Sequence, residues 1–270
     1  MSEVILEARG IQKSFGGVMA VAGVDLTIRR GEIFALIGPN GAGKTTTFNL
    51  LSGTHALDRG EVVFDGQPVT GLPAHRVAAL GLVRTFQNLQ IFGSMTVLEN
   101  VMVGCHLHSR AGFAAAALRL PGVIAEERRV RGQALEFLEM VGLAGRAADP
   151  ASSLPFGQQR LLEIARALAA KPKLLMLDEP AAGLTRPETE SLDGLIWRIR
   201  DGGLTVLLVE HDMNLVMGIA DRVAVLHYGQ KIADGTPAEV QADEKVVGAY
   251  LGMEWNTEPA SFLLEETPGA

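Results

Sequence analysis

The chain has 270 residues, of which 47% are hydrophobic, so it can bury the core of one α/β domain or of one domain with a subdomain. A net charge of −7 and a pI of about 5.4 argue against a nucleic-acid partner, because such proteins usually carry a basic surface. No apolar run approaches the ~18 residues of a membrane span, and no signal peptide is recognisable at the start.

Short apolar runs in the first third of the chain predict β-strands that are separated by turn residues. The predicted strands are Val4–Ala8, Val24–Ile28 and Ile33–Ile37, with Glu61–Phe64 and Leu82–Phe86 as further candidates.

Directly after Ile37 the sequence Gly-Pro-Asn-Gly-Ala-Gly-Lys-Thr matches the phosphate-binding pattern G-x-x-x-x-G-K-[ST]. The strand before it and a helix start after it supply the strand–loop–helix context that distinguishes such a loop from a glycine-rich turn. Backbone N–H groups and the helix dipole favour phosphate here, Lys44 is placed to reach the β- and γ-phosphates, and Thr45 to bind Mg²⁺. The predicted nucleotide-binding residues are Gly38, Pro39, Asn40, Gly41, Ala42, Gly43, Lys44, Thr45 and Thr46.

From Thr96 to about Leu143 the pattern becomes helical, although residues 106–123 cannot be assigned. The single cysteine, Cys105, allows no internal disulfide, which fits a reducing cytoplasm, and we interpret it as a packing residue rather than a nucleophile. Within 126–141, apolar residues follow helical spacing at Val130, Ala134, Phe137, Leu138 and Val141.

Strands and helices alternate in the second half, which indicates a parallel sheet covered on both faces. From Gly252 onward the chain is polar and is predicted to form a loose tail. The predicted elements are helix Gly157–Ala170, strand Leu174–Leu177, helix Glu188–Arg200, strand Thr205–Val209, helix Met213–Ala220 and strand Arg222–Leu226.

The strand candidate Leu174–Leu177 ends in the two acids Asp178 and Glu179. Taken alone, this could be a strand that ends in a solvated acidic turn. With a phosphate loop elsewhere in the chain, a buried strand end can hold Asp178 as a ligand for Mg²⁺ at the mouth of that loop. Glu179 can then take a proton from an attacking water.

Over residues 4 to 252 the sequence resembles the nucleotide-binding subunit of an ATP-binding-cassette (ABC) transporter. The resemblance rests on elements that together are specific and that singly mean little. In chain order they are Phe15, the phosphate loop, Gln87 in Arg84-Thr85-Phe86-Gln87, the signature Leu154-Pro155-Phe156-Gly157-Gln158-Gln159-Arg160, Asp178-Glu179, and His211 in Val209-Glu210-His211-Asp212.

The resemblance implies a role for each element and binding of ATP with Mg²⁺. Phe15 stacks on adenine, Gln87 contacts Mg²⁺ and the attacking water, and His211 bonds the γ-phosphate and orients water beside Glu179. Gly157 and Gln158 open a helix whose N-terminus faces the γ-phosphate of ATP bound to a partner subunit.

Two motifs depart from the usual pattern of the family. The signature has Pro155 and Phe156 where the family has Ser and Gly, so it lacks a hydroxyl and an N–H group. The loop after Glu179 has Thr185 where the family has Asp. A degenerate site is one interpretation of these changes. Because Lys44, Gln87, Glu179 and His211 are present, we expect the site of this chain to be competent and the partner's site to be the one that Pro155 and Phe156 weaken.

The implied fold is an α/β P-loop NTPase of ABC type, with a mixed sheet, an antiparallel β subdomain and a helical subdomain. The nucleotide-binding domain covers 1–252, its helical subdomain about 96–170, and the tail 253–270. The phrases around the signature and around His211 resemble the first of two ATPase subunits in branched-chain amino acid uptake systems.

That resemblance implies a peripheral protein on the cytoplasmic face of the inner membrane. Its partners would be two transmembrane permease subunits, a second related ATPase and, indirectly, a solute-binding protein, with a homodimer of this chain still possible. A urea, amide or other amino-acid importer remains an alternative, and a soluble ABC ATPase of DNA repair or translation is a second one.

Overall fold

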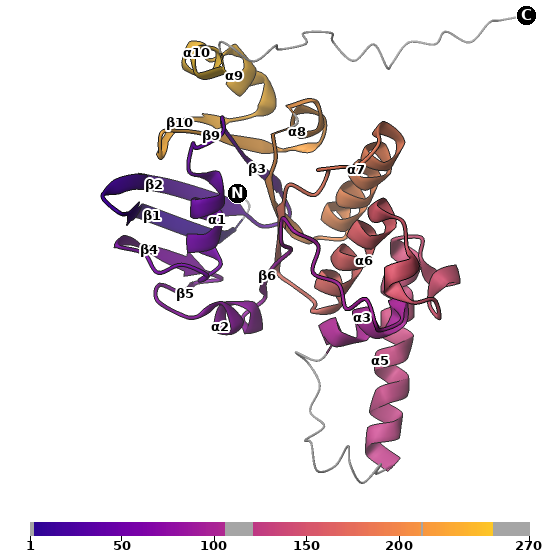
Figure 1. Cartoon of the computed structure of the whole chain (residues 1–270). Helices are drawn as coiled ribbons and strands as arrows, with labels where there is room; N and C mark the ends of the chain where they lie inside the picture. The colour runs from indigo at the N-terminus through magenta and orange to yellow at the C-terminus, as the bar shows by residue number, and fades with distance from the viewer. Residues whose placement is uncertain (1–2, 106–120, 212, 251–270) are drawn as a thin grey trace, which may run out of the picture.

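The computed structural model describes residues 3–105, 121–211 and 213–250. The predicted tail and most of the unassigned segment 106–123 lie outside these residues. Two β-sheets and a group of helices form three layers (Figure 1). No helix among the described residues is long and apolar enough to cross a membrane.

The central sheet has six strands in the order β10-β9-β3-β8-β7-β6. The pairs β3–β8, β3–β9, β7–β8 and β6–β7 are parallel, and only the edge strand β10 is antiparallel. Every residue of β3, β7 and β8 is buried, which explains their uninterrupted apolar sequences. The strands are β3 (Ile33–Ile37), β6 (Leu82–Arg84), β7 (Leu174–Asp178), β8 (Thr205–Val209), β9 (Arg222–His227) and β10 (Gln230–Gly235).

One face of this sheet packs on a second, antiparallel sheet of order β2-β1-β4-β5. Successive side chains of β3 point to opposite faces of the central sheet. Phe34 and Leu36 belong to the core shared with the second sheet, whereas Ala35 belongs to the core shared with the helices. Helix α1 (Lys44–Leu51) contributes Phe48 to the sheet-to-sheet core. The second sheet consists of β1 (Val4–Phe15), β2 (Val18–Arg29), β4 (Arg59–Phe64) and β5 (Gln67–Pro68).

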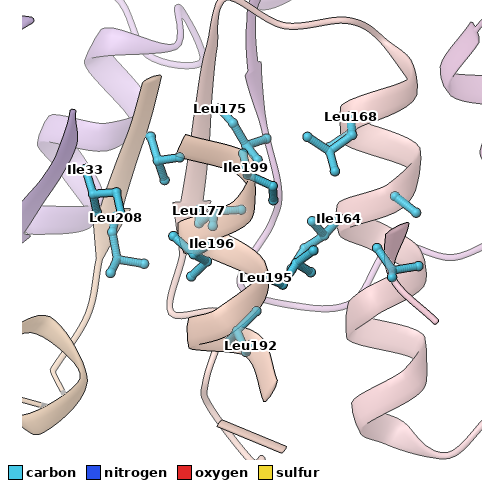
Figure 2. Packing of buried hydrophobic residues seen from close by; sticks show 14 of the residues in the cluster. Ile33, Ile164, Leu168, Leu175, Leu177, Leu192, Leu195, Ile196, Ile199 and Leu208 are labelled. Carbon is cyan, nitrogen blue, oxygen red and sulfur yellow. The ribbon is translucent and has the colours of Figure 1, made fainter. Parts of the chain in front are cut away.

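Helices cover the other face of the central sheet (Figure 1). Figure 2 shows how α7 packs Leu192, Leu195, Ile196 and Ile199 toward the strands, with Ile164 and Leu168 of α6 alongside. The stripe predicted within 126–141 is confirmed, because Ala134, Leu138 and Val141 are buried. These helices are α3 (Val97–Cys105), α5 (Pro121–Met140), α6 (Phe156–Ala169), α7 (Arg186–Asp201) and α8 (Met213–Ile219).

Several boundaries differ from the sequence predictions. Strands β1 and β2 are 12 residues each, because β1 continues past Ala8 through a register shift that includes Gly10 at φ 55°. Residues beyond Arg84 leave the sheet, so the strand predicted to reach Phe86 ends earlier. Short elements that were not predicted include β5, β10, α2 (Ala74–Ala79), α9 (Pro237–Ala242) and α10 (Glu244–Tyr250), and none of these three helices spans two full turns.

Cys105, at the end of α3, is buried in the helical core, as expected for a packing residue. Burial raises the pKa of its thiol, which disfavours the reactive thiolate.

Candidate nucleotide-binding site

The loop between β3 and α1 requires glycine at two positions. Gly38 and Gly43 have φ values of 150° and 99°. A Cβ atom on Gly38 would lie 2.2 Å from the carbonyl oxygen of Leu226, and one on Gly43 would lie 2.4 Å from that of Ala20. These neighbours are backbone atoms that cannot move aside, so any side chain would displace the loop.

The N-terminus of α1 is left open to an anion. Its N-cap is Gly43, no side chain caps it, and no acidic residue lies in its first turn. Thr45 is exposed on this turn and Thr46 is half-buried. The turn between β9 and β10 is joined to this loop by a hydrogen bond, in which the Gly229 N–H donates to the Ala42 carbonyl at 2.9 Å. Free N–H groups and the helix dipole therefore point to phosphate at this position.

Lys44 places a buried cation within the loop. Its side-chain Nζ donates to the carbonyl oxygens of Gly38 at 2.6 Å and Pro39 at 3.1 Å. Burial lowers the pKa of Lys44, and the nearby carboxylates of Glu179 and Asp178 oppose this shift. Burial of the ammonium costs desolvation energy, and a negatively charged ligand beside it would offset that cost.

Asp178 ends β7 beside this cation and is 2% exposed. Its Oδ1 atom is buried and has no hydrogen-bond partner among the described residues, and Oδ2 lies 3.7 Å from an amino group of Arg84. Burial raises the pKa of Asp178, so a cation bound there would stabilise its charged form. An orphaned carboxylate oxygen near a phosphate loop fits Mg²⁺, which prefers oxygen ligands.

The structure brings the three predicted catalytic residues together. The Gln87 amide Nε2 donates to Oε2 of Glu179 at 2.9 Å, and Nδ1 of His211 lies 4.0 Å from Oε1 of the same carboxylate. Glu179 adopts φ 46°, and its N–H donates to the Val209 carbonyl at 2.8 Å. Left-handed backbone at a residue other than glycine is strained, and such strain clusters at functional sites.

Phe15 ends β1 with 46% of its surface exposed, as expected for a stacking platform. The ring of His55 meets it edge-on at a centroid distance of 5.6 Å, and Nζ of Lys13 lies 5.5 Å from its centroid. Asp58 holds this strand end, because its carboxylate accepts from Lys13 at 2.8 Å and from the N–H of Ser14 at 2.7 Å.

Gly157 and Gln158 lie at a different place, on the first turn of α6. A Cβ on Gly157 would lie 2.3 Å from Oε1 of Glu188 in α7, and Gln158 accepts a hydrogen bond from Arg146 at 3.3 Å. Helix α6 begins at Phe156, one residue before the predicted start, with Pro155 as an N-cap that offers no side-chain hydrogen bond. The signature residues thus form a second uncapped helix start.

The sequence analysis gave no role to three charged residues that the structure connects to the site. Arg84 lies against Asp178, and the buried pair Arg160 and Glu163 contacts the segment that contains Gln87. A possible signal was the charged pair at i, i+3 spacing on the inward-facing side of α6.

Comparisons with known proteins agree with this geometry. A family model described as "ABC transporter" matches residues 21–182. The chain belongs to the ABC transporter family. A second model, "Branched-chain amino acid ATP-binding cassette transporter", matches residues 230–252. The protein is therefore an ABC-type ATPase, and the predicted fold class is confirmed.

Individual relatives cover nearly the whole chain. The high-affinity branched-chain amino acid transport ATP-binding protein BraF of Pseudomonas aeruginosa is 46% identical over 93% of this chain and 99% of its own length. The ADP conformation of the ABC transporter cassette MJ1267 superposes with a TM-score of 0.81 at 32% identity, covering 93% of this chain and all of that one. The dimeric cassette MJ0796 gives 0.73 at 26% identity, covering 86% and 99%.

Proposed function

We propose that this ATPase powers an importer of branched-chain amino acids. The observation that supports this solute class most directly is the match of residues 230–252 to the branched-chain family model. The 46% identity to BraF, which extends over 93% of the chain, supports the same assignment.

The proposed roles follow from the contacts of each side chain. Lys44 binds the β- and γ-phosphates together with the loop N–H groups, and Phe15 stacks on adenine, which contributes about 1–3 kcal/mol by analogy with base stacking. Glu179 accepts a proton from the attacking water. Gln87 and His211 both approach this carboxylate, so they are suited to orient that water.

Asp178, Thr45 and Gln87 would hold Mg²⁺, whose chemistry is to neutralise charge on phosphate oxygens. The buried Oδ1 of Asp178 is the atom that supports this assignment.

The proposed assembly has two ATPases, of which this chain is one, and two transmembrane permeases, with a solute-binding protein delivering the solute. The dimeric structure of the cassette MJ0796 supports pairing of cassettes. We place the protein at the cytoplasmic face of the inner membrane, held there by the permeases. Residues 1–252 form the nucleotide-binding domain, whose helical subdomain covers about 96–170, followed by a tail.

The solute is tested by transport. The permeases, the second ATPase and the binding protein encoded beside this chain would be reconstituted in liposomes with ATP inside. We expect ATP-dependent uptake of radiolabelled leucine, and none with a Lys44→Ala subunit. Uptake of urea or an amide, with leucine excluded, would overturn the branched-chain assignment.

A further inference from the structure

Helix α6 contains a buried ion pair between Arg160, the last residue of the signature, and Glu163. Arg160 is 2% exposed and Glu163 is 1% exposed, and their charged atoms lie 3.0 Å apart. Removing two charges from water is costly and is compensated only when their remaining donors and acceptors also find partners. The partners of these additional hydrogen bonds therefore indicate which part of the chain the ion pair fixes in place.

The further hydrogen bonds of the pair go to the main chain of residues 86–90, whereas Nε of Arg160 is buried and has no hydrogen-bond partner among the described residues. One amino group of Arg160 donates to the carbonyl of Phe86 at 3.1 Å, and the other donates to that of Gln87 at 3.2 Å. Glu163 accepts from the N–H of Gln90 at 3.4 Å. The planar guanidinium fork presents its donors in a fixed arrangement, which suits two adjacent carbonyl oxygens and the carboxylate of Glu163 together.

This main chain belongs to no helix or strand, and the side chain of Gln87 is exposed. Its amide nevertheless reaches Glu179 at 2.9 Å. With the backbone of Gln87 fixed by Arg160, fewer conformations are lost when that contact forms.

We propose that Arg160 is a positioning residue for ATP hydrolysis. It anchors the Gln87 segment to the helix that begins with the signature, so that Gln87 meets Glu179. A change in the position of this helix is thereby transmitted to Gln87. The proposal rests on the proposed catalytic roles of Gln87 and Glu179.

A kinetic double-mutant cycle tests whether Arg160 acts through Gln87. In the complex with the second ATPase, whose own catalytic glutamate is silenced, Arg160→Met should lower kcat for ATP about 10-fold and leave KM within about twofold. Arg160→Lys should fall between, since one ammonium replaces the fork. In a Gln87→Ala background, Arg160→Met should have little further effect. An equal loss of kcat in both backgrounds would overturn the proposal.

Two further variants serve as controls for an effect on folding. Arg160→Met with Glu163→Leu replaces the pair by apolar side chains, which is often neutral for stability, and should show the same kinetic loss. Arg200→Met removes an arginine that pairs with Asp221 in another part of the fold and should leave kcat unchanged. A loss of kcat in Arg200→Met equal to that in Arg160→Met would mean that the effect is one of general stability.

Hydrogen exchange gives a readout that does not depend on catalysis. Amides in residues 86–92 should exchange about 10-fold faster in Arg160→Met than in the wild type or in Arg200→Met. Unchanged exchange would refute the anchor. A wild-type complex without ATPase activity would contradict the proposed catalytic roles, while the exchange result would still decide the anchor.

Discussion

Helices α1 and α6 both begin without a side-chain cap, but their surroundings differ. Helix α1 starts after Gly43, whose missing side chain allows the loop to pack against the backbone of β2. Helix α6 starts after Pro155 in extended conformation, and Phe156 lies against Gly183. The first helix start has Lys44 within its loop and is near Glu179 and Asp178. The second has the carboxylate of Glu188 beside Gly157.

The difference shows that an open helix N-terminus alone does not make a phosphate site. At α1 the chain itself supplies a cation, a potential metal ligand and a base. At α6 the neighbouring acid on α7 provides no compensation for an anion. We therefore infer that α1 belongs to a site built by this chain, whereas the action of α6 on the site of a partner subunit stays a prediction from the family resemblance.

Replacement of Lys44 should have the largest effect on the α1 site. Lys44→Ala should abolish ATP binding or hydrolysis, because the loop loses the cation that compensates phosphate charge. The melting temperature should stay equal or rise, since burial of the ammonium is itself unfavourable. Binding of a fluorescent ATP analogue, phosphate release and calorimetry measure this. Hydrolysis at the wild-type rate would contradict the assignment of the loop.

Glu179→Gln should retain ATP binding and slow turnover by roughly 10²–10⁴-fold, the range for loss of a positioned base. The amide keeps the shape of the carboxylate but cannot accept the proton. It should also trap an ATP-bound dimer that gel filtration detects. Turnover within about threefold of the wild type would show that Glu179 is not the base.

Pro155→Ser sharpens the comparison at α6. The new hydroxyl and N–H should change turnover at the partner's site by roughly twofold to tenfold, the net effect of one hydrogen bond. The measurement is phosphate release from a complex with the second ATPase, in which one catalytic glutamate at a time is silenced.

The location of this effect decides the prediction about α6. It should persist with Glu179 silenced and vanish with the partner's glutamate silenced. The reverse pattern would contradict action across the interface.

The smallest effect is expected at the platform of Phe15. Hydrogen bonds from Lys13 and Ser14 lower the pKa of Asp58 to about 2 from its ordinary value near 3.8. Because the folded-state pKa is depressed, the stabilisation is present above pH ~4 and is lost as the pH falls through about 2. The free energy of unfolding of Asp58→Asn, measured with urea, should therefore be lower than that of the wild type at pH 5 and equal to it near pH 2. A difference in the free energy of unfolding that persists at pH 2 would show that the ionised form of Asp58 is not its cause.

The sequence predicted the parts of the fold that repeat a pattern. Continuous apolar strands such as β3 and β7, and the stripe along α5, were found with errors of a few residues. The continuation of β1 beyond Gly10 was missed, since a glycine inside a strand resembles a turn until its partner strands are known. The short elements α9 and α10 are held by packing rather than by periodicity.

At the site, the motifs located the residues but not what holds them. That Gln87, Glu179 and His211 meet was implied by family resemblance, and the structure places them together. Arg84 and Arg160 were not identified, because their partners lie 94 (178 − 84) and 73 (160 − 87) residues away in the chain. Spacing within a helix cannot reveal such contacts.

The β9–β10 turn ties the phosphate loop to the two sheets. Gly229 donates to Ala42 in the phosphate loop, and its carbonyl accepts from Ala22 of β2 at 2.8 Å, so one residue joins the loop to both sheets. Gln87 lies in an irregular segment that is anchored to α6 instead. The phosphate loop is thus tied to both sheets and Gln87 to α6, so a shift of α6 relative to the sheets would change the position of Gln87 relative to the loop.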